Sequence, residues 1–319
     1  MRASLRPSTR ATFMPDAATT ARILAEAMPY LRAYRGKTIV VRFGGRAMAD
    51  AALKRDFARD VALLRLVGMQ PIVVHGGGWR IDELLEATGH NPHRHRGWRV
   101  TDAETLNVVE MVLDEINQEL TGLINRHGGR AVGINGQDGR CIRAVPLVLP
   151  PTAGGERADL GFVGDVASID AELIRLLLSR NFVPVIMPIG VAADGTAYHI
   201  QSDRLAGRLA RTLSAEKLVL MTNNAGITDR RGNLAYVVMA SEAEAMVADG
   251  TISGEIVPRV DAAIEAVRQG VRSVHIIDGG VPSALLLEVL TADGIGTALR
   301  SDEGPRFFDD ARAYLQAPR

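Results

Sequence analysis

The sequence predicts an α/β fold, a three-layer α/β/α sandwich around a mostly parallel central sheet. Three observations support this prediction: short β-branched runs recur along the chain, amphipathic segments of helical period separate them, and glycines follow several of the runs. A strand that is apolar along its whole length is buried on both faces, and strands that alternate with helices pair in parallel. Helices are therefore expected to cover both faces of the sheet.

The first expected element is a helix over residues 17–34, which ends before Gly36. Its apolar residues recur at helical spacing and are Ile23, Leu24, Ala27, Met28 and Leu31. Strands are then expected at 38–43, 71–76, 130–135, 182–189, 217–222 and 273–278, with helices between them at 53–67, 103–126 and 171–179. The segment "PPTAGGERADLGFVGD" (150–165) interrupts this alternation and predicts a hairpin or a flap over a site.

Composition narrows the classes of partner. Lysine plus arginine and aspartate plus glutamate each number 37, so the formal net charge is zero, and neither nucleic acid nor an anionic membrane is an expected partner. No apolar run approaches the roughly 20 residues of a membrane span. The single cysteine, Cys141, cannot form an intramolecular disulfide, so we expect a cytoplasmic protein. Residues 1–14 contain no acid; a transit peptide, a disordered tail and an early start codon all stay open.

Glycines follow the first two expected strands at their carboxyl ends, where open α/β sheets bind ligands. Gly44 and Gly45 follow the first strand, and Gly76, Gly77 and Gly78 follow the second and precede a helix. One Gly-Gly pair is usually only a tight turn. Two such turns favour an anion site, because bare backbone amides and helix N-termini attract negative charge. Neither turn matches the Walker A or the Rossmann pattern.

Several long motifs then resemble one family. They are "KTIVVRFGGRAM", "PIVVHGGGWRID", "GWRVTDAETLNVVEMVLDEINQEL", "INGQDG", "DLGFVGDV", "PVIMPIG", "AEKLVLMTNNAGI" and "VHIIDGGVPSALLLEVLTADGIGTAL". Over about residues 20–299 the chain resembles the N-acetylglutamate kinases of the amino acid kinase superfamily. The resemblance implies the amino acid kinase fold. It also implies phosphorylation by ATP and Mg²⁺ of the side-chain carboxylate of N-acetyl-L-glutamate, or of a similar acylated acidic amino acid, in arginine biosynthesis.

The resemblance also implies a domain layout and a set of site residues. Residues 1–36 would form a tail and an assembly helix, 37–195 the substrate lobe, 196–300 the nucleotide lobe and 301–319 a C-terminal tail. The implied catalytic residues are Arg42, Asp203 and Arg259. Those implied to bind substrate are Gly44, Gly45, Gly76, Gly77, Gly78, Arg99, His199 and Gln201. Those implied to bind nucleotide are Thr222, Asn223 and Gly226, and Glu288 and Gly294 resemble part of an arginine effector site.

Some of these positions depart from the family pattern. The family has lysine at the positions of Arg42 and Arg259, asparagine at that of His199, and a carboxylate where this chain has Asn223. Sequence drift is one explanation, because the chain has only three lysines among its 37 basic residues. A changed site is the other, because arginine is a planar fork and lysine a compact point charge. Two hypotheses therefore stay open: a carboxylate kinase, or a catalytically weak paralogue with a changed substrate or a regulatory or binding role.

The helix at 17–34 resembles the extra N-terminal helix of arginine-inhibited N-acetylglutamate kinases. The resemblance implies a homo-oligomer, a hexamer or a dimer, although a helix at this position could also pack only against its own chain.

Overall fold

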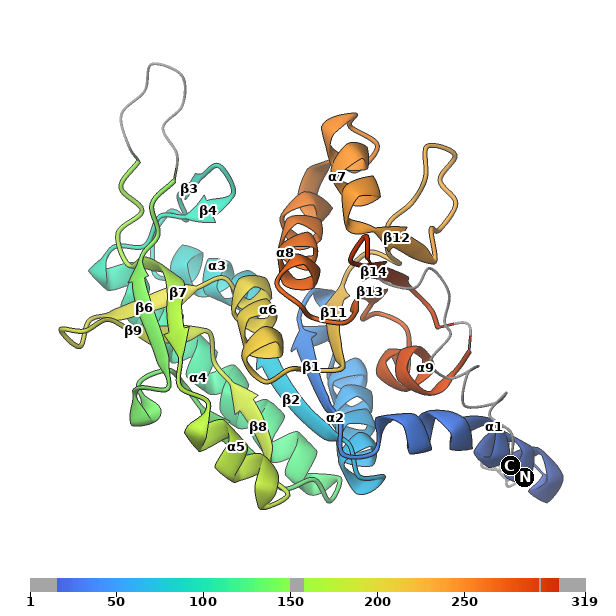
Figure 1. Ribbon diagram of the computed structural model, residues 1–319. Coiled ribbons are helices and arrows are strands. Elements are labelled where there is room, and N and C mark those ends of the chain that lie inside the picture. Colours follow the sequence, from blue (N-terminus) through green and yellow to red (C-terminus); the bar gives the residue numbers. More distant parts are fainter. Residues whose placement is uncertain (1–15, 150–157, 293, 304–319) are drawn as a thin grey trace, which may run out of the picture.

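The centre of the protein is an eight-stranded sheet with the strand order β12-β14-β13-β11-β1-β2-β8-β5 (Figure 1). The computed structural model describes residues 16–149, 158–292 and 294–303. The strands are β1 (Thr38–Phe43), β2 (Gln70–His75), β5 (Ala131–Ile134), β8 (Val183–Ile186), β11 (Lys217–Thr222), β12 (Val237–Met239), β13 (Val274–Asp278) and β14 (Thr297–Arg300). Every neighbouring pair is parallel except β13 and β14. The predicted fold class is confirmed.

Two apolar clusters, one on each face, hold the sheet between its helices. Val40 of β1 belongs to one cluster and its neighbours Ile39 and Val41 to the other, as expected when successive side chains point to opposite faces. The helices of the first cluster are α5 (Glu172–Ser179), α6 (Ser202–Thr212), α7 (Ala240–Ala248) and α8 (Val257–Arg268). Those of the second are α2 (Ala51–Leu66), α3 (Gly78–Ala87), α4 (Ala103–Arg126) and α9 (Ala284–Leu290).

The single strand expected at 182–189 is wrong. β8 ends at Ile186, and a separate strand β9 (Ile189–Val191) begins after Pro188. Proline has no N–H to donate to a sheet, so it interrupts the ladder at this point. β9 instead joins a closed four-stranded barrel with β6 (Ile142–Pro146), β7 (Val163–Ile169) and β10 (Ala197–Ile200). β6 and β7 pair antiparallel on either side of the segment that interrupted the sequence pattern.

The remaining elements are short. A two-stranded hairpin, β3 (Arg94–His95) and β4 (Trp98–Arg99), follows α3. The described residues also form short 3₁₀ helices, η1 (Arg46–Met48), η2 (Asp138–Arg140) and η3 (Gly254–Ile256). No helix in the described ranges is both long and apolar enough to span a bilayer.

Helix α1 (Ala17–Tyr34) confirms the predicted first element and extends away from the body of the molecule (Figure 1). Asp16 caps it by accepting a hydrogen bond from the Thr19 N–H at 2.8 Å. Within the helix only Tyr34 is buried, whereas Ile23, Leu24 and Met28 are 53%, 61% and 43% exposed. The predicted features within 1–14, 150–157 and 304–319 lie outside the described residues.

Candidate active site

A cleft of about 720 Å³ lies where β1 and β2 end and α6 begins. A second hollow of about 250 Å³ shares much of its lining with this cleft. Of the residues predicted from the sequence, those lining the larger cleft are Arg42, Gly44, Gly45, Gly76, Gly77, Gly78, Gln201, Asp203, Asn223 and Arg259. Arg99 and His199 line the smaller hollow. The predicted substrate and catalytic residues therefore come together at one edge of the sheet.

Arg42 emerges from the end of β1 into the cleft, and its side chain is almost fully buried. Its Nε donates to Ser202 Oγ at 3.1 Å, and its Nη1 donates to the Met221 carbonyl at 3.1 Å. The same Nε lies 2.9 Å from Oδ1 of Asp203. Burial lowers the pKa of Arg42, Asp203 opposes the shift, and the positive charge of Arg259 adds to it. Because arginine stays protonated in proteins, the lowered pKa reflects the cost of holding this charge in the interior.

Position 44 requires glycine because of the Arg42 side chain. The guanidinium folds back over Gly44, and a Cβ at that position would overlap Nη1. Gly45 follows with a φ of +77°, a left-handed conformation that favours glycine. Asn223 faces this turn from the end of β11, and its Oδ1 accepts the Arg46 N–H at 2.6 Å. Two glycines are thus needed so that a buried cation and a neighbouring strand can approach the same backbone.

The N-terminus of α6 also lines the cleft, through Gln201 and Asp203. Asp203 lies in the first turn of this helix, where the helix dipole favours a negative charge. Gln201, the N-cap residue, lines both the cleft and the hollow. The arrangement puts a buried carboxylate beside Arg42 and leaves the positive end of a helix at the cleft.

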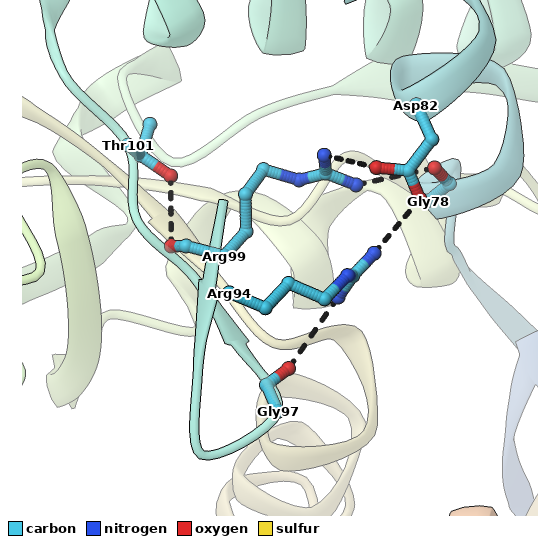
Figure 2. A network of polar contacts seen from close by, with 6 residues as sticks. All are labelled: Gly78, Asp82, Arg94, Gly97, Arg99 and Thr101. Carbon is cyan, nitrogen blue, oxygen red and sulfur yellow. Dashed lines mark hydrogen bonds and ion pairs between the residues drawn. The ribbon is translucent and has the colours of Figure 1, made fainter. Parts of the chain in front are cut away.

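Asp82 on α3 is a site residue that the sequence reasoning missed (Figure 2). One of its carboxylate oxygens accepts a hydrogen bond from Arg99 Nη1, and the other accepts one from Arg94 Nη2 at 2.8 Å. Arg99 also donates from Nη2 to the Gly78 carbonyl at 3.2 Å. Burial alone would raise the pKa of Asp82, but hydrogen bonds and charge from the two arginines hold it below its ordinary value.

The spacing of Asp82 from the glycine turn could have identified it as a site residue. Asp82 lies four residues after Gly78, so it shares one helix face with the glycine turn. The sequence did not predict that the β3–β4 hairpin folds back over this face. That hairpin brings Arg94 and Arg99 to Asp82 (Figure 2).

His199 on β10 lies in the smaller hollow, near Arg99 and Arg94. Burial, with the positive charges of those two arginines, lowers its pKa to about 4. His199 is therefore neutral at physiological pH, and it can give or accept a hydrogen bond without adding a charge.

Four predicted residues do not line the cleft or the hollow. The Thr222 hydroxyl accepts the Asn224 N–H at 3.0 Å and lies against the Ile277 carbonyl, and Gly226 packs tightly on Thr297. Glu288 is buried on α9. His275 Nδ1 donates to its carboxylate, and the Ile295 N–H donates to it at 2.8 Å. Gly294 lies against the same carboxylate.

Among the described residues, no group of three or more His, Cys, Asp or Glu side chains is placed to hold a metal ion.

A nucleotide-sized cleft with buried cations and glycine turns at the ends of parallel strands is typical of enzymes that transfer phosphoryl groups. The chain matches the amino acid kinase family over residues 37–278, and it belongs to that family. It is 55% identical over 287 residues to the acetylglutamate kinase of Chromobacterium violaceum, covering 90% of this chain and 99% of that one. The acetylglutamate kinase of Nitrosomonas eutropha is 51% identical over 282 residues, covering 88% and 96%.

Solved structures agree with this assignment. N-acetylglutamate synthase from Neisseria gonorrhoeae, complexed with coenzyme A and N-acetyl-glutamate, matches with a TM-score of 0.79 and 28% identity. That match covers 88% of this chain and 63% of the synthase chain. Carbamate kinase from Giardia lamblia bound to AMP-PNP matches with a TM-score of 0.59 at 17% identity, which supports the fold alone.

Proposed function

We propose that the protein transfers the γ-phosphoryl group of ATP to the side-chain carboxylate of N-acetyl-L-glutamate, giving the acyl phosphate used in arginine biosynthesis. One observation carries this proposal. In a chain 55% identical to an acetylglutamate kinase, Arg42, Asp203, Arg259 and two glycine turns line a single cleft. The comparisons support this enzyme and not the regulatory alternative.

The reaction joins two anions, so the protein's main task is to position them and to stabilise charge. An oxygen of the acceptor carboxylate forms a bond to the γ-phosphorus, the bond from that phosphorus to the β–γ bridging oxygen breaks, and ADP leaves with the electron pair. Arg42 and Arg259 would stabilise the transferring group from the cleft walls. Asp203 would hold Arg42 in place through its 2.9 Å ion pair.

The smaller hollow suits the acceptor. Arg99 would bind the α-carboxylate of the amino acid, because a guanidinium matches a carboxylate with two parallel hydrogen bonds. His199 and Gln201 would bind the acyl amide, a task suited to neutral polar groups. Gly76, Gly77 and Gly78 would contact the reacting carboxylate and the phosphoryl group between the hollow and the cleft.

The larger cleft suits the triphosphate. Gly44 and Gly45 offer backbone amides, and the N-terminus of α6 favours negative charge. Asn223 would contribute to nucleotide binding indirectly, because it accepts the Arg46 N–H and so holds the Gly44–Gly45 turn. Thr222 and Gly226 would fix the conformation of the neighbouring backbone. Mg²⁺ would enter as the ATP complex and offset part of the negative charge of the phosphates.

For assembly we propose a cytoplasmic homo-oligomer, a dimer or a hexamer, in which α1 packs against another copy. The observation behind it is the exposure of Ile23, Leu24 and Met28 on a helix that extends from the body (Figure 1). Glu288 and Gly294 stay proposed effector residues; binding there would require a ligand to compete with His275 for the carboxylate.

Hydroxylamine trapping tests the reaction directly. Wild-type protein with MgATP and N-acetyl-L-glutamate should give a hydroxamate, and omission of either substrate should abolish it. An inert wild-type chain that also fails to bind MgATP in titration calorimetry at millimolar concentration would overturn the kinase assignment.

A further inference from the structure

His75 is the last residue of β2 and directly precedes the Gly76–Gly78 turn. It is fully buried, and each of its two ring nitrogens has one polar partner. Its Nδ1 lies 3.0 Å from the Gly76 carbonyl oxygen, and its Nε2 lies 3.1 Å from Nδ2 of Asn117 on α4. The same Nδ2 donates to the Val185 carbonyl of β8 at 2.9 Å. A buried chain of hydrogen bonds therefore runs from β8 through α4 and His75 to the turn.

The direction of this chain follows from its far end. A carbonyl can only accept, so the Asn117 atom facing Val185 must be the amide nitrogen, and that nitrogen must also donate to His75. Nε2 of His75 is then the acceptor, so the proton of the neutral ring is on Nδ1. Nδ1 consequently donates to the Gly76 carbonyl. Gly133 leaves room for the Asn117 side chain, because a Cβ there would overlap the amide oxygen.

The ring is neutral under physiological conditions. Burial lowers the pKa of His75 to about 4, with the charge of Arg42 in the same direction and the Gly76 carbonyl opposing it. His75 is therefore a neutral ring with its proton on Nδ1 at neutral pH.

The consequence for the turn comes from the planar trans peptide, in which the C=O of one residue points opposite to the N–H of the next. When His75 holds the Gly76 carbonyl in the interior, the Gly77 N–H points away from it, toward the cleft that both glycines line. Three other groups of the turn are engaged: the Gly76 N–H donates to the Phe43 carbonyl, the Gly77 carbonyl accepts from Ile81, and the Gly78 carbonyl accepts from Arg99. Among the described residues, no hydrogen bond uses the Gly77 N–H.

We propose that His75 and Asn117 are positioning residues that hold the Gly76–Gly78 turn with the Gly76 carbonyl inward, so that the Gly77 N–H is presented to the anion in the cleft. The identity of that anion, a carboxylate or a phosphoryl group, rests on the function proposed above. The orientation of the turn does not, because it follows from contacts within the chain.

Two substitutions at position 75 separate positioning from packing. In His75→Asn the amide nitrogen occupies the place of Nδ1 and still donates to Gly76, but contact with Asn117 is lost. In His75→Gln the side-chain end occupies the place of Nε2 and still meets Asn117, but the Gly76 contact is lost. We expect kcat to fall by about 10- to 100-fold in His75→Gln and by less than about fivefold in His75→Asn, with the KM for N-acetyl-L-glutamate changed less than kcat.

Packing alone predicts the reverse order, because glutamine is closer to histidine in volume. Equal activity of the two variants, or higher activity of His75→Gln, overturns the proposal. Asn117→Leu should likewise lower kcat. The control is Asn125→Leu on the same helix. The Asn125 amide bonds the backbone of Ala131 and does not contact His75, so this variant should keep wild-type kcat.

Nitrogen NMR of histidine-labelled protein tests the inference without any activity. The His75 signal, assigned by its loss in His75→Asn, should report a neutral ring protonated at Nδ1 in wild-type protein. Asn117→Leu should lose that preference and Asn125→Leu should keep it. A ring protonated at Nε2 in the wild type would refute the tautomer even if the enzyme is active. An inactive wild type with the Nδ1 tautomer would refute only the proposed reaction.

Discussion

The Nε atom of Arg42 lies 2.9 Å from Oδ1 of Asp203, which joins the end of β1 to the first turn of α6 in one buried ion pair. The Nε hydrogen is directed at Ser202 Oγ, and no donor among the described residues makes a hydrogen bond to Asp203 Oδ1. A carboxylate of this kind is expensive to bury. Its position beside the proposed reacting groups suggests that it is retained to hold Arg42 rather than for stability.

Arg42→Lys should lower activity although it restores the residue type that the family resemblance implies. The guanidinium donates in two directions, to Ser202 and to Met221, and one ammonium cannot reproduce both contacts. We expect kcat to fall by about tenfold, against about 10²- to 10³-fold for Arg42→Ala, which removes the charge. Steady-state kinetics with MgATP checks this. Full activity of the lysine variant would favour sequence drift.

Gly44→Ala should disable the same arginine without changing it. The new methyl group would occupy the place of Nη1 of Arg42, so the guanidinium must move out of its contacts. We expect a loss of kcat comparable to that of Arg42→Lys, about tenfold. Gly122→Ala is the control: this glycine lies in α4 with open space around it, and alanine there should stabilise the helix by up to about 1 kcal/mol. Equal kinetics for both variants would argue against the steric explanation.

Asp82→Asn should weaken acceptor binding more than nucleotide binding. The carboxylate holds both Arg94 and Arg99, and an amide can accept from only one of them in the same geometry (Figure 2). We expect the KM for N-acetyl-L-glutamate to rise by about tenfold and the KM for ATP to change by less than about twofold, since a charge-assisted hydrogen bond contributes about 1.5–3 kcal/mol. Equal increases in both constants would contradict the assignment of the smaller hollow to the acceptor.

Acidification should destabilise the fold between about pH 6.5 and pH 4. His75, His199 and His275 each have a pKa lowered to about 4 in the fold, mainly by burial. The unfolded chain therefore binds more protons than the folded chain in this window, so stability falls as pH falls. Urea unfolding should give a lower midpoint at pH 5 than at pH 7. An unchanged midpoint would mean that the three rings titrate normally in the fold.

Leu24→Glu combined with Met28→Glu should reduce the size of the oligomer, and so should a shortened chain that begins at Lys37. The double substitution replaces two of the three exposed apolar side chains of α1 and leaves Ile23, whereas the shortened chain lacks all three; neither changes a residue of the sheet. Leu66→Glu is a matched control, because Leu66 is 81% exposed at the end of α2, a different helix. Light scattering measures the mass in each case. An unchanged mass in both α1 variants would mean that the helix takes no part in assembly.

The sequence predicted six strands of the eight-stranded sheet, missing the short β12 and β14, and it predicted most of the cleft, for a physical reason. Parallel strands bring their carboxyl ends to one edge, so Arg42 at the end of β1, the glycines that follow it and the Gly76–Gly78 turn after β2 had to lie close together. Asp82 was missed because its role depends on a hairpin that folds back from later in the chain. Thr222 was placed beside the nucleotide, but its hydroxyl bonds within the chain. Position after a strand does not determine the direction of a side chain.

The engaged carbonyls of the Gly76–Gly78 turn would also make the cleft favour a negatively charged ligand over one that donates hydrogen bonds. A ligand that arrives with negative oxygens would meet N–H donors, whereas one that offers N–H groups of its own, such as the side-chain amide of glutamine, would find the carbonyl oxygens of the turn already engaged by His75, Ile81 and Arg99. N-acetylglutamine could still place its side-chain amide oxygen at the Gly77 N–H, but its amide nitrogen would have to compete with those three donors, so it should bind more weakly than N-acetylglutamate.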